Sequence, residues 1–128
     1  MVAYSFKPMF VPLIRAGTKR QTIRAVGQRR HARVGEGLQL YCGMRTAHCF
    51  KILEQDPRCE RVDPVLFIPG AGDLRVAGEQ LRTATALDRY ARQDGFDDFA
   101  QMVAFWLEEH GPRLFRGNAY VWSPYVTV

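Results

Sequence analysis

Features that would assign this chain to a membrane or to an oxidising compartment are missing from the sequence. No apolar run approaches the roughly 18 residues of a membrane-spanning helix, and residues 1–8 lack the charged start and apolar stretch of a secretory signal. Cysteine is scarce, and Cys42, Cys49 and Cys59 never form a C-x-x-C pair. We expect a cytoplasmic protein with free thiols, although the spacing of Cys42 and Cys49 leaves a disulfide geometrically open.

Metal-ligating patterns are also missing. A structural zinc site needs a complete set of cysteine or histidine ligands at short, regular spacings. His31, His48 and His110 are instead scattered along the chain. We therefore predict no metal ion and no cofactor.

Lysine is rare among the basic residues, and arginine supplies most of the positive charge. The chain has 18 basic and 13 acidic residues, a net charge of +5. Residues 1–61 hold 12 basic against 4 acidic residues (+8), and residues 62–128 hold 6 against 9 (−3). Because arginine binds phosphate and stacks on bases, this asymmetry favours a nucleic-acid or nucleotide partner. A basic protein with solvated arginines fits the composition equally well.

The densest cluster of cations lies in residues 17–33 (GTKRQTIRAVGQRRHAR), which contain no acidic residue. Within it, the β-prone residues 21–24 place the Thr22 hydroxyl among fixed positive charges. Such a segment is typical of a solvated basic edge, of a phosphate-binding surface, or of a site where a lysine activates a hydroxyl. The cations of the cluster are Lys19, Arg20, Arg24, Arg29, Arg30 and Arg33.

Most of the chain up to residue 81 has the pattern of short strands. A strand at residues 4–6 is followed by a short helix that ends at Gly17. Pro64 is expected to mark a sheet edge or a bend. A long loop rich in arginine and glycine covers residues 25–37. The further strands are expected at residues 21–24, 38–42, 48–53, 62–68 and, around a turn, 74–81.

Two helices and a closing strand at residues 119–122 complete the pattern. Thr85 and Asp88 resemble a weak helix start, Gly95 ends that helix, and Asp97 is a good N-cap for the next one. We predict one α+β domain over residues 1–128, in which a short N-terminal helix and two later helices pack on a small β-barrel or strongly curved sheet. Its oligomeric state is left open between a monomer and a weak dimer.

Six segments spread over nearly the whole chain form a set: residues 5–8 (SFKP), 16–24 (AGTKRQTIR), 34–41 (VGEGLQLY), 91–96 (ARQDGF), 105–106 (FW) and 118–122 (NAYVW). Together they resemble the ASCH family, which is named for a domain of activating signal cointegrators and is similar to PUA domains. The resemblance implies a PUA-like β-barrel with a cleft lined by the loop after the first helix. It also implies RNA, or a modified nucleoside derived from RNA, as the ligand.

One branch of that family, the small bacterial N4-acetylcytidine amidohydrolases, uses a lysine, a threonine three residues later and a glutamate near the later helices. Lys19 and Thr22 match the first two, and the glutamate position falls on Asp94. The resemblance thus implies that Thr22 attacks the amide carbonyl while Lys19 accepts its proton. Asp94 would orient Lys19 or protonate the leaving amine, and Arg24 or backbone amides would stabilise the oxyanion. Other ASCH proteins are reported as ribonucleases.

The same residues also allow purely structural roles. Thr22 can be a β-branched strand residue, Lys19 a solvated cation at a helix end, and Asp94 a turn residue before Gly95. Convergence of Lys19, Thr22 and Asp94 on one cleft is the structural test of the catalytic hypothesis.

The alternative hypothesis is a basic cleft that binds an RNA segment. In it, the arginines neutralise phosphates and the aromatic Tyr41 and Trp122 are candidate stacking platforms, with a core position favoured for Trp122. The residues predicted to contact such a ligand are Arg20, Arg24, Arg29, Arg30, Arg33 and Tyr41.

Overall fold

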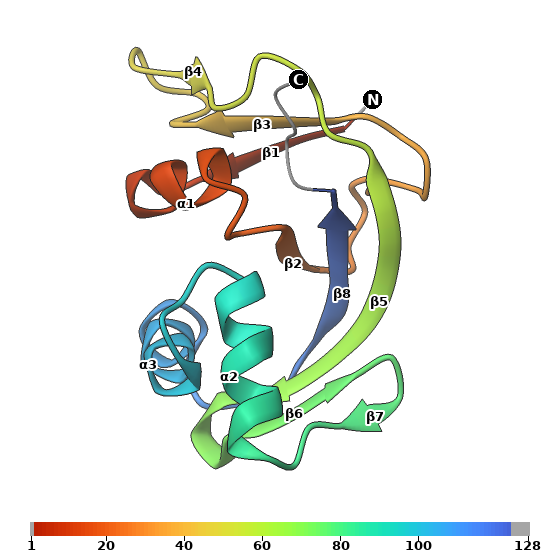
Figure 1. Ribbon diagram of the computed structural model, residues 1–128, viewed down its shortest axis with the longest axis vertical. Coiled ribbons are helices and arrows are strands. Elements are labelled where there is room, and N and C mark those ends of the chain that lie inside the picture. The colour runs from red at the N-terminus through yellow and green to blue at the C-terminus, as the bar shows by residue number, and fades with distance from the viewer. Residues whose placement is uncertain (1, 124–128) are drawn as a thin grey trace.

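The chain has an α+β fold whose strands form two sheets (Figure 1). The computed structural model describes residues 2–123. The smaller sheet contains β1 (Val2–Phe6), β3 (Leu38–Cys42) and the short β4 (Phe50–Lys51) in the order β1-β3-β4. Strand β1 is parallel to β3, and β4 is antiparallel to it.

The larger sheet is antiparallel and has the order β2-β8-β5-β6-β7. Its long central strands β5 (Cys59–Ile68) and β8 (Phe115–Trp122) curve past the smaller sheet in Figure 1. The remaining strands are β2 (Gln21–Ala25), β6 (Asp73–Val76) and β7 (Glu79–Gln80).

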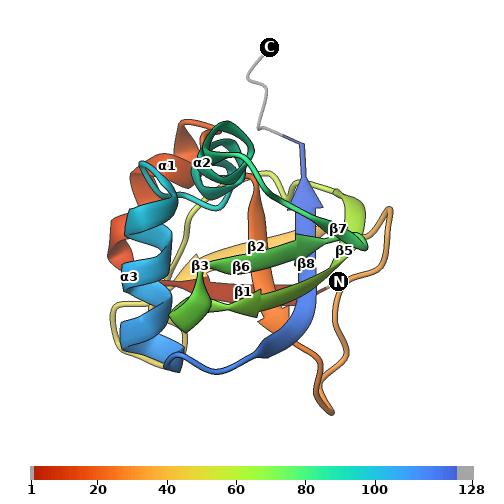
Figure 2. The same ribbon diagram turned by 90° about the horizontal axis from the view of Figure 1, so that it is seen from below.

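Three α-helices gather along one side of the sheets (Figure 2). The 3-10 turn η1 (Pro8–Phe10) leads directly into α1 (Val11–Arg15), as expected for a short helix that begins with prolines. Helices α2 (Ala84–Gln93) and α3 (Phe99–His110) pack on each other before β8, and a second 3-10 turn, η2 (Pro69–Ala71), contacts α3. The predicted arrangement of one early and two late helices is confirmed.

Backbone hydrogen bonds join the two sheets where β3 and β5 begin. The amide of Leu38 donates to the Pro57 carbonyl at 2.8 Å, and the amide of Cys59 donates to the Glu36 carbonyl at 2.8 Å. This connection is as tight as a strand ladder but covers only a few residues.

At β1 and β2, which are edge strands of their sheets, side chains make the connection instead. The β1 carbonyls of Ser5 and Ala3 accept hydrogen bonds from the guanidinium groups of Arg24, at 2.8 Å, and Arg29. The predicted α+β class is confirmed, but the small β-barrel does not close within residues 2–123, because no ladder joins β1 to β2. Two arginines of the basic stretch satisfy β1 carbonyls that a neighbouring strand would otherwise pair.

The core lies between the sheets and beneath the helices. Among its most completely buried side chains are residues from four strands and α3: Tyr4, Leu38, Leu40, Phe67, Met102 and Trp122. Trp122 is thus a core residue, packed edge-on against Phe6. Within residues 2–123, no helix is long and apolar enough to cross a membrane.

Several predicted boundaries differ from the structure. The strand expected at residues 48–53 shrinks to β4, because a second turn covers its start, in which the Cys49 amide donates to the Thr46 carbonyl at 3.4 Å. Pro64 lies in the interior strand β5 rather than at an edge. The Pro64 carbonyl accepts from the Ala77 amide, in the turn where the pairing of β5 with β6 ends. The missing N–H of Pro64 therefore lies beyond that ladder and removes none of its hydrogen bonds.

The predicted helix caps are each displaced. Thr83, not Thr85, caps α2 by accepting from the Ala86 amide, and Asp98, not Asp97, caps α3 by accepting from the Gln101 amide at 2.8 Å. In both cases the capping residue has the extended backbone that lets its side chain reach back to the first turn.

Candidate functional site

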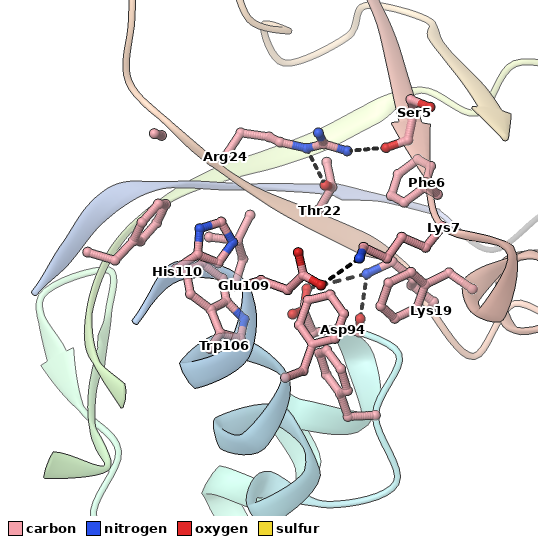
Figure 3. A pocket seen from close by; sticks show the side chains of 16 residues that line it. Ser5, Phe6, Lys7, Lys19, Thr22, Arg24, Asp94, Trp106, Glu109 and His110 are labelled. Atoms are coloured by element: carbon pink, nitrogen blue, oxygen red, sulfur yellow. Dashed lines mark hydrogen bonds and ion pairs between the residues drawn. The ribbon is translucent and has the colours of Figure 1, made fainter. Parts of the chain in front are cut away.

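A pocket of about 440 Å³ opens between β1, β2 and α3 (Figure 3). Its lining mixes aromatic side chains with polar and charged ones. The aromatic residues are Phe6, Phe10, Phe96, Phe105, Trp106 and Phe115; the polar and charged residues are Ser5, Lys7, Lys19, Thr22, Arg24, Asp94, Glu109 and His110. The structure therefore brings Lys19, Thr22, Arg24 and Asp94 together in one pocket.

The end of α1 positions Lys19. The chain leaves the helix at Gly17, whose φ of 78° suits glycine, and the Lys19 amide then bonds back to the Leu13 carbonyl at 3.1 Å. Gly95 allows the lysine stem to pass: a Cβ at this position would lie 2.8 Å from Lys19 Cδ. The segments before β2 and after α2 are thereby packed against each other.

Lys19 and Asp94 form a buried pair at the floor of the pocket. Lys19 Nζ donates to the Asp94 backbone carbonyl and lies 3.6 Å from Asp94 Oδ1, and each residue is 4% exposed. Burial lowers the pKa of the Lys19 ammonium, opposed by the Asp94 charge, and burial raises the pKa of the Asp94 carboxyl, opposed by Lys19. The two proton affinities are thus pushed toward each other, which is what proton transfer near neutral pH requires.

Gln21 and Gln93 continue this network behind the pocket. Gln21 Nε2 donates to Asp94 Oδ1 at 3.1 Å, and Gln93 Nε2 donates to Gln21 Oε1 at 2.8 Å. The sequence contained no signal for this arrangement, because Gln21 follows Lys19 and Arg20 in a strand where an outward amide would be equally ordinary.

Thr22 is bonded to Arg24 rather than to Lys19. Arg24 Nε donates to Thr22 Oγ1 at 2.8 Å while its Nη2 donates to the Ser5 carbonyl, and the guanidinium lies 5.3 Å from the centre of the Phe6 ring. Because Arg24 is the donor, the Thr22 hydroxyl proton stays available to a base. The adjacent cation also stabilises any negative charge on that oxygen.

A second ion pair joins the two sides of the pocket. Lys7 Nζ, after β1, lies 2.5 Å from Glu109 Oε1 near the end of α3, and the side chains are 52% and 33% exposed. Beside them, the His110 ring lies 4.4 Å from the Trp106 ring. Sequence reasoning missed Lys7, Glu109 and His110, since only the approach of α3 to β1 turns these ordinary helix-end and loop residues into pocket residues.

The other predicted ligand residues lie outside the pocket. Arg30 makes a bidentate ion pair with Glu36, at 2.7 and 2.8 Å, and Arg29 packs on Tyr4 and bonds to β1. Arg20 and Arg33 are exposed, and Tyr41 is half-buried in β3, but none of these three lines the pocket. The basic stretch thus divides between the pocket and the loop after β2.

His31 anchors that loop to the core. Its Nδ1 is 3.0 Å from the Tyr4 hydroxyl, its Nε2 is 3.0 Å from the Ala25 carbonyl, and its ring stacks on Tyr120. Burial lowers the pKa of His31, with a further contribution from nearby Arg29.

No cluster of histidine, cysteine, aspartate or glutamate suited to a metal ion occurs among the described residues. No family model matches the chain, and neither the curated proteins nor the solved structures compared with it include a match. The ASCH resemblance therefore stays a prediction from sequence motifs.

Proposed function

We propose that this protein hydrolyses the acyl amide of a small, uncharged, nucleoside-sized ligand, with N4-acylated cytidine as the first substrate to test. The observation that carries the proposal is the buried Lys19–Asp94 pair in the same pocket as the Thr22 hydroxyl bonded to Arg24. A lysine with a lowered pKa, a carboxylate and an activated hydroxyl are the groups that acyl transfer needs.

The charges of the pocket support a neutral ligand. Lys7, Lys19 and Arg24 face Glu109 and Asp94, and two of the three cations are already in ion pairs with these carboxylates. A site for several phosphates would instead present unpaired cations. The aromatic side chains of the lining suit the face of a base, which stacks on such rings whatever its sequence context.

The proposed chemical steps use the groups that line this one pocket. Thr22 Oγ attacks the acyl carbonyl carbon while its proton passes to the neutral amine of Lys19. The C–N bond breaks as Lys19 returns the proton to the leaving nitrogen, which leaves an acyl ester on Thr22. Water then hydrolyses the ester to a carboxylic acid and restores the hydroxyl. Lys19 contacts Asp94 in the free protein, and catalytic hydrogen bonds commonly tighten only when the ligand binds.

The test is hydrolysis of N4-acetylcytidine by the wild type and by Lys19→Met and Thr22→Val. We expect Lys19→Met to lower kcat/KM by about 10²–10⁴-fold, the usual contribution of a general base, and Thr22→Val to lower it at least as far. Lys51→Met, at an exposed ion pair far from the pocket in β4, is the matched control and should keep full activity. No turnover of any acylated cytidine by the wild type, or full activity of Thr22→Val, would overturn the proposal.

Binding of an RNA segment, with or without cleavage, is the second candidate, and the excess positive charge of residues 1–61 favours it. Salt separates the two. An RNA complex that depends on phosphates should weaken steeply as salt rises, whereas turnover of an uncharged nucleoside should hardly respond. The same RNA should be recovered intact unless the protein is a ribonuclease.

A further inference from the structure

We propose that Gln21 is a positioning residue of the pocket, which holds the Asp94 carboxylate ionised and in place beside Lys19. The burial of Gln21 is the first observation. Its strand breaks the usual alternation, because Gln21 and Thr22 are both buried although they are consecutive in β2, and Gln21 is 0% exposed. A buried amide destabilises the fold unless its polar atoms are bonded.

The bonds of the Gln21 amide leave it only one orientation. Its Oε1 accepts from Gln93 Nε2, which forces its Nε2 toward Asp94 Oδ1. The flipped amide would place Oε1 against a carboxylate oxygen and Nε2 against the Gln93 amide nitrogen, losing both bonds. The main chain of Gln93 is held in place as well, because its backbone carbonyl accepts from the Arg20 amide at 2.9 Å. The group that faces Asp94 must be a donor, because an ionised carboxylate can only accept hydrogen bonds.

A donor fixed in this way favours the charged form of the carboxyl group. Asp94 is buried, and burial alone favours its neutral form. The charged groups that act on Asp94 are Lys19 and Arg24. From α2 the half-buried Tyr90, whose hydroxyl group is buried, faces the same network, and from β5 Asp63 and Arg61 act on Tyr90.

Removing the Gln21 donor should therefore shift the titration of Asp94 and leave the titration of Lys19 unchanged. In Gln21→Met the Asp94 carboxylate loses a hydrogen bond, so its titration should shift upward by about 1–2 pH units, the usual value of a hydrogen bond to a charged group. The titration of Lys19 should stay in place, because the Gln21 amide bonds to Asp94 and not to Lys19. A merely structural glutamine would move neither titration.

The scarcity of lysine makes the measurement direct. The chain contains only Lys7, Lys19 and Lys51, so NMR of protein labelled with ¹³C at lysine Cε should give three signals. The Lys19 signal should show two inflections, one from Asp94, which we call the acid inflection, and one from the Lys19 ammonium itself. Gln80→Met is the matched control, since Gln80 Nε2 bonds to Asp73 Oδ1 at 3.1 Å without a lysine nearby.

We expect the acid inflection to move up in Gln21→Met and to stay unchanged in Gln80→Met. If Gln21→Met does not fold, Gln21→Glu carries the test, because it keeps the size and the acceptor for Gln93. A carboxyl group against Asp94 should raise the acid inflection further, as two such groups share a proton. An unchanged acid inflection in a folded variant of Gln21 overturns the proposal.

The catalytic meaning of Gln21 rests on the proposed function, but the titration needs no substrate. If the inflection shifts but the protein shows no turnover, the hydrolase proposal is wrong and the positioning role of Gln21 stands. In an active enzyme, the acid limb of the kcat/KM profile should move by the same amount as the NMR inflection. Turnover together with an unmoved acid limb in Gln21→Met would sink the positioning role alone.

Discussion

Replacing Asp94 with asparagine tests whether Lys19 is held as a buried cation. In the Asp94→Asn variant the backbone carbonyl that accepts from Lys19 Nζ remains, but the carboxylate 3.6 Å away is gone. Lys19 is almost fully buried and close to the Phe10 ring, so water cannot replace the lost charge. The lysine has two options, which are to stay charged without a partner or to release its proton.

Release of the Lys19 proton sets an upper limit on the loss in free energy of unfolding. At 3.6 Å the lost attraction is about 5 kcal/mol for an effective dielectric constant of about 20. Releasing the proton costs about 1.4 kcal/mol for each pH unit below the ordinary pKa of 10.5, or about 5 kcal/mol at pH 7 and about 2 kcal/mol at pH 9. The loss in free energy of unfolding should therefore be at most about 5 kcal/mol at pH 7 and should shrink to about 2 kcal/mol at pH 9.

The direction in which stability changes with pH follows from the number of protons bound in the folded and unfolded states. With its pKa in the folded variant below 10.5, Lys19 binds more protons in the unfolded state, so the stability of the variant rises with pH. Denaturant unfolding of wild type and variant at pH 7 and pH 9 measures the difference. Asp56→Asn, beside the exposed Lys51, is the control, and its effect should not depend on pH in this window. An Asp94→Asn effect equal at both pH values would refute the reasoning.

Two further predictions concern ion pairs outside the floor of the pocket. Lys7→Met or Glu109→Gln should speed ligand association, because either substitution removes the ion pair that joins the two sides of the pocket. Stopped-flow fluorescence of Trp106, which lines the pocket, measures the association rate. Unchanged rates in both variants would contradict this prediction. Glu36→Gln should be less stable than wild type at neutral pH. Its bonds to Arg30 and to the Arg33 amide lower the pKa of Glu36 from 4.5 to about 2, so the stability that it contributes is lost as pH falls through that range. Acid unfolding followed by circular dichroism should show the difference shrinking as pH falls from 4.5 toward 2; a difference that stays constant over this range would contradict the assignment.

Local patterns predicted the helices and most of the strands. The apolar spacing in α3 and the glycines at its boundaries are encoded within a few residues, so the element could be read without its neighbours. The caps were displaced by one or two residues because adjacent Thr or Asp residues have similar capping chemistry. Which of them adopts the extended backbone depends on how the helix packs.

The reason that the barrel does not close lies in long-range contacts. Edge strands β1 and β2 have the composition of paired strands, but Arg24 and Arg29 take the β1 carbonyls that a ladder would use. A sequence indicates that these arginines are basic and does not indicate that their partners are backbone carbonyls. The expected phosphate-binding role of Arg30 meets the same problem, since Glu36 already occupies its guanidinium.

The sequence by itself determined which chemical groups the protein has: a lysine and a threonine three residues apart before and within one strand, and a carboxylate at the end of a later helix. Spacing sets these positions because it is a property of the covalent chain. The tertiary structure decided their partners. It buried Asp94 against Lys19, placed the Thr22 hydroxyl in a hydrogen bond with Arg24, and brought Gln21 and Glu109 to the site. Burial and hydrogen bonding across some seventy or more residues depend on how α2 and α3 pack against β1 and β2, and only the folded chain fixes that packing.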